Sequence, residues 1–321
     1  THLAAEDFAE LVAAYDVGDL VSAKGIAEGV SNSNWLIETT GRDGMGARFI
    51  LTMYERRIDV GHLPFYLGLL DHLSALGCPV PATIHDREGN ASREIAGKAV
   101  ALIEFLPGVS IDRPTPAQAR AVGGALAQLH LAVADFPLNG VQTMGLAEWD
   151  RLIHACGRGG LAKIDPALPD ITFGELSHLA GAWPSGLPQG VVHCDLFPDN
   201  VLMLGDRVSG LIDFYFAAED FFAYDLAVTH AAWSFTTDGG QFRPDVGKAL
   251  LDGYRARRGL SDSELAELPT LARGACMRFI ASRSYDWLHT PSDALVTRKD
   301  PLAFVRRLQF YAEAGHRPFQ S

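Results

Sequence analysis

The chain has 321 residues and a formal net charge of −12, and 48% of its residues are hydrophobic. This length exceeds that of a usual single core, so we expect two lobes, while the composition is ordinary for a soluble globular enzyme. The negative charge disfavours a general nucleic-acid binder and an anionic membrane surface as partner, but not a nucleotide, whose phosphates a metal ion can balance.

The cysteines and the N-terminal residues favour a reducing compartment. The four cysteines are scattered and no two have CxxC spacing, so the sequence predicts neither a zinc site nor a disulfide framework. The first twenty residues are acidic and amphipathic and lack the apolar region of a secretory leader. No run of eighteen apolar residues occurs. We therefore expect a cytoplasmic protein.

The first hundred residues are expected to be β-rich with one main helix. A short helix is predicted over residues 3–15, where apolar residues repeat at helical spacing. Residues 19–40 predict two strands joined by a Gly/Ser/Asn turn, and residues 48–55 predict a third. Residues 63–77 have the amphipathic pattern of the main helix. Residues 83–108 predict two more strands around an EGN turn.

Beyond Pro107-Gly108 the pattern becomes mostly helical. Thr115 has the preference of a helix N-cap, and Pro116 suits the first helical position after it. Residues 191–216 are the exception and predict short strands around a loop. An α+β fold is therefore expected, with the lobe boundary at the change in composition. The predicted lobes are residues 1–106 and 107–321.

Polar residues suited to phosphoryl transfer gather in residues 191–216. His193, Asp195 and Asn200 match HxDxxxxN, and Asp213 follows thirteen residues later in the segment IDF. In-line transfer needs one carboxylate beside the attacking hydroxyl, and an amide oxygen with a second carboxylate to hold Mg²⁺ against the nucleotide phosphates. The segment between predicts a tight hairpin that returns Asp213 to the neighbourhood of Asn200, where both reach one ion. The alternative is a chance cluster of solvated loop acids.

Several segments resemble one family closely. The most specific are HCDLFPDNVL and GLIDFYFA, accompanied by GVSNSNWLIET, FILTMYE, AYDLA and RFIASRSYDWL. They resemble the aminoglycoside-phosphotransferase and choline-kinase branch of the protein-kinase-like fold, and most of all its bacterial homoserine kinases. This resemblance implies a small antiparallel N-terminal sheet lobe with one main helix that covers the nucleotide. A larger, mostly helical lobe would carry catalysis and the acceptor.

The resemblance also implies a role for each residue of the motif. Asp195 would be the catalytic base, and Asn200 with Asp213 would bind Mg²⁺, with ATP as the phosphate donor and L-homoserine as the acceptor. Asp225 would brace the active-site loop; the alternative is a first-turn acid of the next helix. His193 is expected to brace the same loop through hydrogen bonds rather than to act as a general base.

The nucleotide side carries weaker signals. Small polar residues at the turn between the first two strands would cradle phosphate oxygens, although such runs are often only turns. They are Ser31, Asn32, Ser33 and Asn34. By the resemblance, the adenine edge would pair with backbone groups near Glu104 and Leu106, the alternative being a plain strand end.

Two positions depart from the wider fold pattern. The strand-three lysine that holds the α- and β-phosphates is replaced by Thr52, and Lys24, Arg56 and Arg57 are the candidates to supply the missing charge. Cys194 stands where Gly is more usual, and we expect it to serve packing rather than chemistry.

A zwitterionic acceptor needs a cation for its carboxylate and an acid or carbonyl for its ammonium group. Arg278, Arg283 and Asp286 occur at helical spacing and are candidates, as is Tyr215 near the metal loop. The alternative for Arg283 and Asp286 is an ion pair within the helix. His130, on a predicted core helix, is expected to be structural.

Two other functions compete with this interpretation. The acceptor would be another alcohol, such as choline, ethanolamine, methylthioribose or an aminoglycoside, if the acids Glu219, Asp220 and Asp225 formed a pocket for a cation. A non-catalytic binding module on the same fold is supported only by Thr52. The sequence does not predict the oligomeric state.

Overall fold

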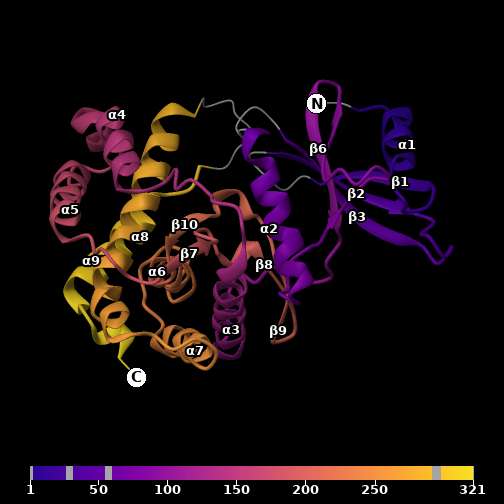
Figure 1. The fold of residues 1–321 in the computed structure, drawn as a ribbon. Helices are drawn as coiled ribbons and strands as arrows, with labels where there is room; N and C mark the ends of the chain where they lie inside the picture. The colour runs from indigo at the N-terminus through magenta and orange to yellow at the C-terminus, as the bar shows by residue number, and fades with distance from the viewer. Residues whose placement is uncertain (1–2, 27–31, 55–59, 291–297, 321) are drawn as a thin grey trace. The chain divides into compact units, whose positions relative to one another are not determined.

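The computed structural model describes residues 3–26, 32–54, 60–290 and 298–320 (Figure 1). They form an α+β fold, as the sequence predicts, with an antiparallel sheet in the N-terminal part and mostly helices after it. The chain divides into two compact units. Unit 1 comprises residues 1–108, 136–138 and 209–215, and unit 2 comprises the rest.

Unit 1 is built on an antiparallel sheet with the strand order β1-β2-β3-β6-β4, in which β5 also pairs with β6. The strands are β1 (Leu20–Ile26), β2 (Asn32–Thr39), β3 (Ala47–Tyr54), β4 (Thr83–Ile84), β5 (Arg93–Ile95) and β6 (Lys98–Glu104). The helices are α1 (Ala5–Ala13) and α2 (Leu63–Ala75). Ile37, Leu51 and Leu102 form a buried core with Phe8 and Leu11, so α1 covers one face of the sheet.

The segment 83–108 forms three strands where the sequence predicts two. The expected turn is present, and the Asp86 carboxylate accepts hydrogen bonds from the Glu88 and Asn90 amides at 2.9 and 2.8 Å. The chain turns again at Ala96-Gly97, where both residues have positive φ, 52° and 71°. Because alanine rarely adopts this conformation, its presence gives no sequence signal for a turn.

Unit 2 is mostly helical. Its helices are α3 (Pro116–Ala132), α4 (Leu146–Ile164), α5 (Leu168–Ala182), α6 (Phe222–Trp233), α7 (Pro244–Arg255), α8 (Asp262–His289) and α9 (Leu302–Ala314). Thr115 caps α3, because its Oγ1 accepts a hydrogen bond from the Gln118 amide at 3.2 Å, and Pro116 is the first helical residue. Both predictions are confirmed.

Two short antiparallel pairs complete the described secondary structure. Strand β7 (Gln189–Val192) pairs with β10 (Ala218–Phe221). Strand β8 (Val201–Leu204) pairs with β9 (Arg207–Leu211), which confirms the hairpin predicted from the sequence.

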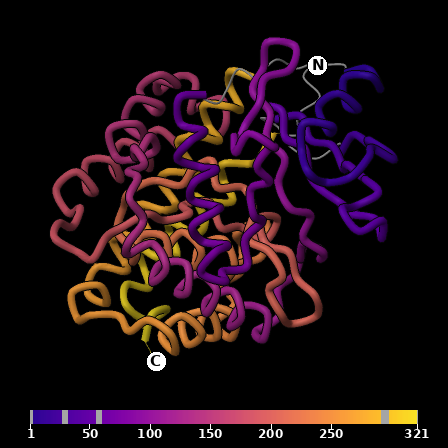
Figure 2. The backbone as a smooth tube through the Cα atoms, turned by 45° about the vertical axis from the view of Figure 1, so that its right-hand side comes forward, coloured from indigo at the N-terminus to yellow at the C-terminus, as the bar shows by residue number. Residues whose placement is uncertain are grey.

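Glycines let α3 and α7 lie side by side at very short range (Figures 1 and 2). A Cβ atom on Gly123 would lie 2.0 Å from the Leu250 carbonyl oxygen, and one on Gly253 would lie 2.0 Å from the Arg120 carbonyl oxygen. A larger residue at either position would force the helices apart. Residues 223–233 of α6 are all buried, as expected for a central helix.

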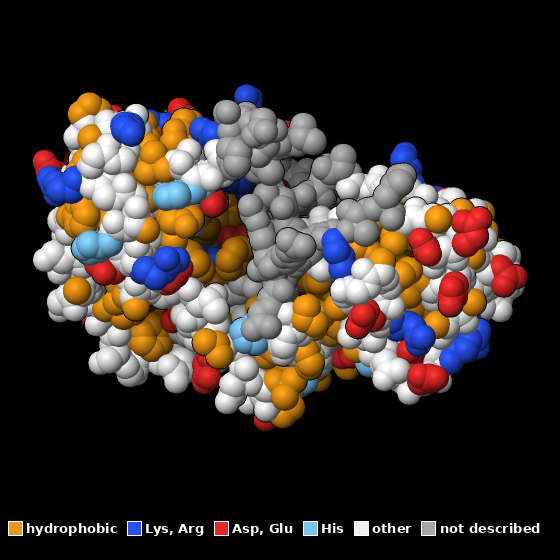
Figure 3. All heavy atoms as spheres, turned by 90° about the horizontal axis from the view of Figure 1, so that it is seen from above, with side chains coloured by type: hydrophobic (Ala, Val, Ile, Leu, Met, Phe, Trp, Pro, Cys, Tyr) orange, Lys and Arg blue, Asp and Glu red, His pale blue; other side chains and the backbone are white. Residues whose placement is uncertain are grey.

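The surface drawn in Figure 3 carries charged side chains of both signs. On the face drawn in Figure 3, acidic and basic side chains are interspersed among the described residues, without a continuous basic stripe. None of the described helices combines the length and the apolar composition that crossing a bilayer requires.

Candidate active site

The HxDxxxxN motif begins at the end of β7, where the chain turns sharply. His193 and Cys194 are buried, and Cys194 has a φ of 61°, in the left-handed region that non-glycine residues seldom occupy. This conformation explains why glycine is more usual at the position. Burial raises the pKa of the Cys194 thiol well above its ordinary value, so the thiol stays protonated, in line with the expected packing role.

The Asp225 carboxylate, at the start of α6, holds both amides of this turn. Its Oδ2 accepts a hydrogen bond from the His193 amide at 2.7 Å, and its Oδ1 accepts one from the Cys194 amide at 2.8 Å. Burial opposes ionisation, but His130 and His193, which both donate hydrogen bonds to the carboxylate, outweigh it and lower the pKa of Asp225. A fully buried carboxylate thus remains charged and bonded to the loop.

The His193 side chain bonds to the same loop. Its Nδ1 accepts a hydrogen bond from the Asp195 amide at 3.2 Å, and its ring is fully buried. A ring nitrogen that accepts from a backbone amide is not available to take a proton from a substrate. This geometry favours the bracing role predicted for His193.

Asp195 and Asn200 lie together in unit 2. The Asn200 Nδ2 donates to the Asp195 carbonyl oxygen at 2.8 Å and to the Asp195 Oδ2 at 3.2 Å. Both donated bonds use the amide nitrogen, so neither uses the Asn200 Oδ1, an oxygen of the hard type that Mg²⁺ prefers. The Asp195 side chain is 18% exposed, so solvent reaches it.

Arg278 on α8 supports the loop from the interior. Its side chain is 2% exposed, donates to the Cys194 carbonyl oxygen, and lies 3.9 Å from the Asp195 Oδ1. The guanidinium stacks over the rings of Phe216 and Phe279 at 5.0 and 4.9 Å. This burial favours a loop-bracing role for Arg278 over the acceptor contact predicted from the sequence.

Arg283, five residues later on α8, is only half-buried. It donates to the Asp300 carbonyl oxygen at 3.1 Å and stacks over Phe304 at 4.6 Å. Among the described residues, no carboxylate lies within ion-pairing distance of it. Burial and the neighbouring Arg307 lower the pKa of Arg283 to about 10, so it stays charged at neutral pH. Asp286, on the same helix, is exposed.

Asp213 and Tyr215 follow β9 and belong to unit 1, whereas Asp195 and Asn200 belong to unit 2. Asp213 is exposed and has a φ of 66°, a left-handed conformation like that of Cys194. The Tyr215 ring meets the Tyr54 ring edge-on, with 5.7 Å between centroids. Burial of its hydroxyl, close to Thr52, raises the pKa of Tyr215 well above its ordinary value.

Asn32, Ser33 and Asn34, predicted to lie in a turn, lie in a strand, which corrects their predicted secondary structure. Ser31 lies outside the described residues, and Asn32, Ser33 and Asn34 are the first residues of β2. Asn34 pairs with both Ile26 and Thr52, so its backbone is engaged in the sheet. A Gly/Ser/Asn run favours turns on average, but cross-strand pairing overrides that preference here.

Thr52 stands at the strand-three position where the wider fold has a lysine. There it makes a hydrogen bond between two neutral groups. Its buried hydroxyl donates to the Asn34 Oδ1 at 2.9 Å. Lys24 on β1 pairs with Leu36, so its side chain leaves the same face of the sheet as Asn34 and Thr52. Lys24 is exposed. The other two candidate cations, Arg56 and Arg57, lie outside the described residues.

Glu104 and Leu106 lie at the end of β6. The Glu104 amide donates to the Ala82 carbonyl oxygen at 2.9 Å, so it is already paired. Residues 105–108 have no regular secondary structure, and Leu106 is half-buried among them. The backbone at Leu106 is therefore better placed than the Glu104 amide for a contact with a base edge.

The sequence analysis did not foresee a polar contact behind Cys194. Gln142 donates to the Asp220 Oδ2 at 2.6 Å and lies 3.8 Å from the Cys194 Sγ. Burial raises the pKa of Asp220. Because Gln142 lies in an irregular segment fifty residues before the motif, no pattern in the sequence connects the two.

No three His, Cys, Asp or Glu side chains gather at one point in the described part of the chain. The predicted ligands are the Asn200 amide oxygen and the Asp213 carboxylate. Hard oxygens of this kind suit Mg²⁺, which usually takes one or two protein oxygens and completes its octahedron with water and substrate phosphates.

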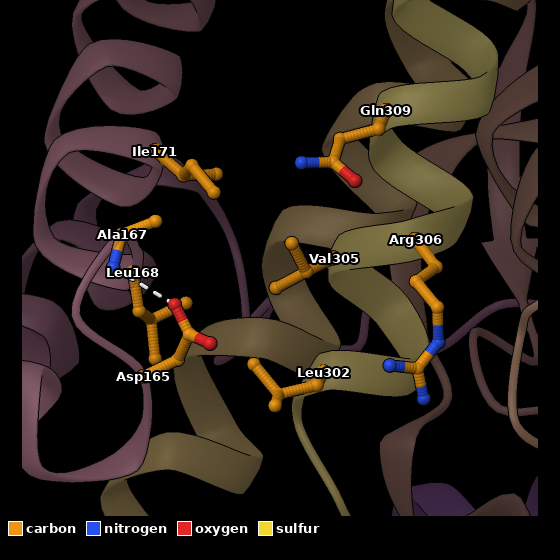
Figure 4. A pocket seen from close by; sticks show the side chains of 8 residues that line it. All are labelled: Asp165, Ala167, Leu168, Ile171, Leu302, Val305, Arg306 and Gln309. Atoms are coloured by element: carbon orange, nitrogen blue, oxygen red, sulfur yellow. Dashed lines mark hydrogen bonds between the residues drawn. The ribbon is translucent and has the colours of Figure 1, made fainter.

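A surface hollow of about 270 Å³ lies between α5 and α9, away from the motif in sequence (Figure 4). Its lining residues are Asp165, Ala167, Leu168, Ile171, Leu302, Val305, Arg306 and Gln309. Asp165 already accepts a hydrogen bond from the Ala167 amide at 2.8 Å, and Arg306 donates to the Asp238 carbonyl oxygen at 2.7 Å. None of the predicted site residues lines this hollow.

The sequence matches a family model described as the phosphotransferase enzyme family over residues 22–260. A homoserine kinase of Nitrobacter winogradskyi is 47% identical to the chain over 315 residues, which cover 98% of this chain and 94% of that relative.

The fold is similar to those of solved small-molecule kinases. An amicoumacin kinase in complex with AMP-PNP, Ca²⁺ and Ami matches with a TM-score of 0.70 and 15% identity, covering 97% of this chain and 94% of that one. A spectinomycin phosphotransferase in complex with ADP and spectinomycin matches with a TM-score of 0.67 and 13% identity, covering 98% and 95%. At these identities the likeness shows the fold alone.

Proposed function

We propose that this chain, which belongs to the phosphotransferase enzyme family, phosphorylates the side-chain hydroxyl of L-homoserine and so acts as a homoserine kinase. The observation that carries this conclusion is the 47% identity to a homoserine kinase along 98% of the chain. The product would be O-phospho-L-homoserine, an intermediate of threonine biosynthesis. The expected cytoplasmic location and the absence of nucleic-acid and membrane partners remain part of this proposal.

Asp195 would align the acceptor hydroxyl and accept its proton as the hydroxyl oxygen attacks the terminal phosphorus of ATP, while the bond from that phosphorus to the bridging oxygen breaks and ADP leaves. The Asn200 amide donates a hydrogen bond to the Asp195 carboxylate, and Arg278 donates one to the neighbouring Cys194 carbonyl oxygen. These two contacts would hold Asp195 in place for the reaction. Asp225 and His193 would keep the loop amides fixed, so that little reorganisation is needed during the reaction.

Mg²⁺ would be held by the Asn200 Oδ1 and the Asp213 carboxylate. Bound there, the ion would offset the phosphate charge during transfer. The left-handed conformations of Cys194 and Asp213 support a functional reading of both loops, because backbone strain of this kind is concentrated at functional sites.

The nucleotide would contact unit 1, the N-terminal lobe of the predicted boundary at residue 106. Lys24 would provide a cation for the phosphates, because it shares a sheet face with Thr52 where the usual lysine is missing. Asn32 and Ser33 precede Asn34 at the start of β2 and would contribute polar groups, as would Ser31, which lies outside the described residues. Backbone groups near Glu104 and Leu106 would meet the adenine.

Arg283 would bind the acceptor carboxylate. It is a largely desolvated cation on α8, the helix that also carries Arg278 near Asp195. The negative charges of Asp195 and Asp300 stabilise its charged form. A charged donor without a counterion gains most from a carboxylate ligand. Tyr215 and Asp286 remain candidates for the rest of the acceptor, Asp286 for its ammonium group.

The acids that follow the metal loop give little support for a cationic acceptor. Asp225 already accepts hydrogen bonds from the His193 and Cys194 amides, and Asp220 accepts one from Gln142. Only Glu219 of the three is exposed.

The test is an ADP-release assay with Mg-ATP against L-homoserine, L-serine, choline, methylthioribose and kanamycin. We expect kcat/KM for L-homoserine to exceed the values for choline, methylthioribose and kanamycin by at least about a hundredfold, because none of these has both a carboxylate and an ammonium group on one carbon. L-Serine has both groups and is one methylene shorter, so its kcat/KM should be lower by about tenfold or more. A preference for choline or kanamycin would overturn the acceptor but keep phosphoryl transfer. Binding of Mg-ATP with no turnover of any acceptor would overturn both.

A further inference from the structure

The hollow between α5 and α9 carries opposite charges on its two walls. Asp165 lies just before α5, and Arg306 lies on α9 (Figure 4). Both belong to the described part of the chain, where they line the hollow without forming an ion pair with each other. Asp165 would repel a simple anion, and Arg306 would repel a simple cation. A small molecule with one charge of each sign is therefore the ligand that complements both walls.

Each charged group keeps atoms that a ligand can use. The Asp165 Oδ1 accepts a hydrogen bond from the Ala167 amide, and no cation in the described part of the chain lies within ion-pairing distance of this carboxylate. The Arg306 Nε donates to the Asp238 carbonyl oxygen at 2.7 Å, and its Nη2 lies 3.5 Å from the Asp300 Oδ2. The Nη1 and the second hydrogen of Nη2 remain to donate to a carboxylate.

Apolar side chains line the rest of the two facing walls. Leu168 and Val305 are buried, and Ile171 and Leu302 are half-buried. Figure 4 shows Ile171 and Val305 pointing toward each other from α5 and α9. The volume of about 270 Å³ lies just below the range of pockets for drug-sized ligands. The hollow is thus too small for a nucleotide, whereas an aliphatic side chain of a few carbons would cover apolar surface there.

We propose that this hollow binds an aliphatic α-amino acid. The ligand's carboxylate accepts hydrogen bonds from the Arg306 guanidinium, its ammonium group donates to the Asp165 carboxylate, and its side chain lies between Ile171 and Val305. The site is separate from the acceptor site, because none of the described residues proposed to contact the acceptor or the metal lines the hollow. The proposal therefore does not depend on the proposed function.

Two isosteric substitutions remove one charge each and keep the local hydrogen bonds. Asp165→Asn keeps an oxygen that accepts from the Ala167 amide. Arg306→Gln keeps a nitrogen at the place of the arginine Nε, which can still donate to the Asp238 carbonyl oxygen. Both side chains are partly exposed, so the melting temperature of the free protein should change little. The control is Arg283→Met, which removes a cation of α8 that does not line the hollow.

The test is isothermal titration calorimetry with L-leucine. We expect saturable binding with a dissociation constant below about 1 mM in the wild type and in Arg283→Met, and binding at least about tenfold weaker in Asp165→Asn and in Arg306→Gln. L-Leucinamide lacks the carboxylate and N-acetyl-L-leucine lacks the ammonium group, so each should bind the wild type at least about tenfold more weakly than L-leucine. No saturable binding of L-leucine up to about 10 mM would overturn the proposal.

The analogues and the variants together identify which wall binds which charged group. Arg306→Gln should bind L-leucine and L-leucinamide with similar affinity, because the partner of the carboxylate is gone. Asp165→Asn should likewise bind L-leucine and N-acetyl-L-leucine with similar affinity, because the partner of the ammonium group is gone. If Arg306→Gln still preferred L-leucine to its amide, or if Arg283→Met lost binding as well, L-leucine would occupy another site and the proposal would fail.

Discussion

The catalytic loop of unit 2 and the β2–β3 strand pair of unit 1 are held in contrasting ways. The loop is fixed by buried charges, with Asp225 on its amides and Arg278 on the Cys194 carbonyl. The strand pair is fixed by the sheet and by a neutral hydrogen bond from Thr52 to Asn34. The residue expected to move a proton is thus held more strictly than the strands that would face the nucleotide. Removing charges should therefore damage the two regions to different degrees.

The largest effect is expected at Asp195. Asp195→Asn should lower kcat by at least about a thousandfold, because the residue positions the hydroxyl and accepts its proton at once. Melting temperature should change little, since Asn can still accept the hydrogen bond from Asn200. The matched control is Asp199→Asn, an exposed loop acid paired with Lys299, which should keep near-native turnover. Similar kcat values for the two variants would remove Asp195 from the mechanism.

Acid should destabilise unit 2 through His230, which is buried beside Tyr311 of α9. Burial lowers the pKa of His230 on α6 to about 3, below the 6.5 of an unfolded chain. Because the unfolded state binds the proton first, stability is lost as pH falls from 6.5 towards 3. The loss should approach about 3 kcal/mol at pH 4.5.

His230→Phe provides the comparison for this pH effect. The variant cannot titrate at the position, so urea unfolding at pH 7.5 and 4.5 should show a smaller loss of stability than in the wild type. It gives up the hydrogen bond to the Tyr311 hydroxyl at 2.6 Å and should be less stable at pH 7.5. Parallel pH dependence in both proteins would show that His230 is not the group that titrates.

The two arginines of α8 should respond differently to the same substitution. Arg283→Met should raise KM for L-homoserine about thirtyfold, the cost of one charged hydrogen-bonding partner, with little change in melting temperature. Arg278→Met should lower both kcat and the melting temperature, because it leaves a buried carbonyl unpaired and removes the cation nearest to Asp195. A raised KM in the Arg278 variant alone would reverse the assignment.

The smallest effect is expected on the strand pair. Lys24→Met should raise KM for ATP about tenfold and leave kcat nearly unchanged, since an exposed cation contributes modestly to phosphate binding. Lys98→Met, at a partly exposed position on β6, is the control for loss of charge. If KM for ATP did not change in Lys24→Met, Lys24 would not bind the phosphates, and groups outside the described sheet would have to do so.

Much of the fold follows from local pattern, because its signals involve near neighbours. The cap at Thr115, the β8–β9 hairpin and the helix that carries Arg278 and Arg283 each depend on residues a few positions apart. The prediction fails at Asn32–Asn34, which are strand residues, and at Ala96, which turns without a turn residue's signature. At Asn32–Asn34 pairing with β1 and β3 overrides the local preference. At Ala96 the close pairing of Ile95 with Lys98 requires a turn between β5 and β6.

The spacing of Asp195, Asn200 and Asp213 is a property of the sequence itself, and it was enough to indicate phosphoryl transfer. The difference in burial between Arg278 and Arg283 is not a property of the local sequence. Both are arginines on one helix, and only the packing of Cys194 and Phe216 around the first buries it. The link from His130 to Asp225, 95 residues apart, likewise exists only because α3, α6 and α7 meet. Burial depends on which distant elements come together, and a local pattern does not contain that information.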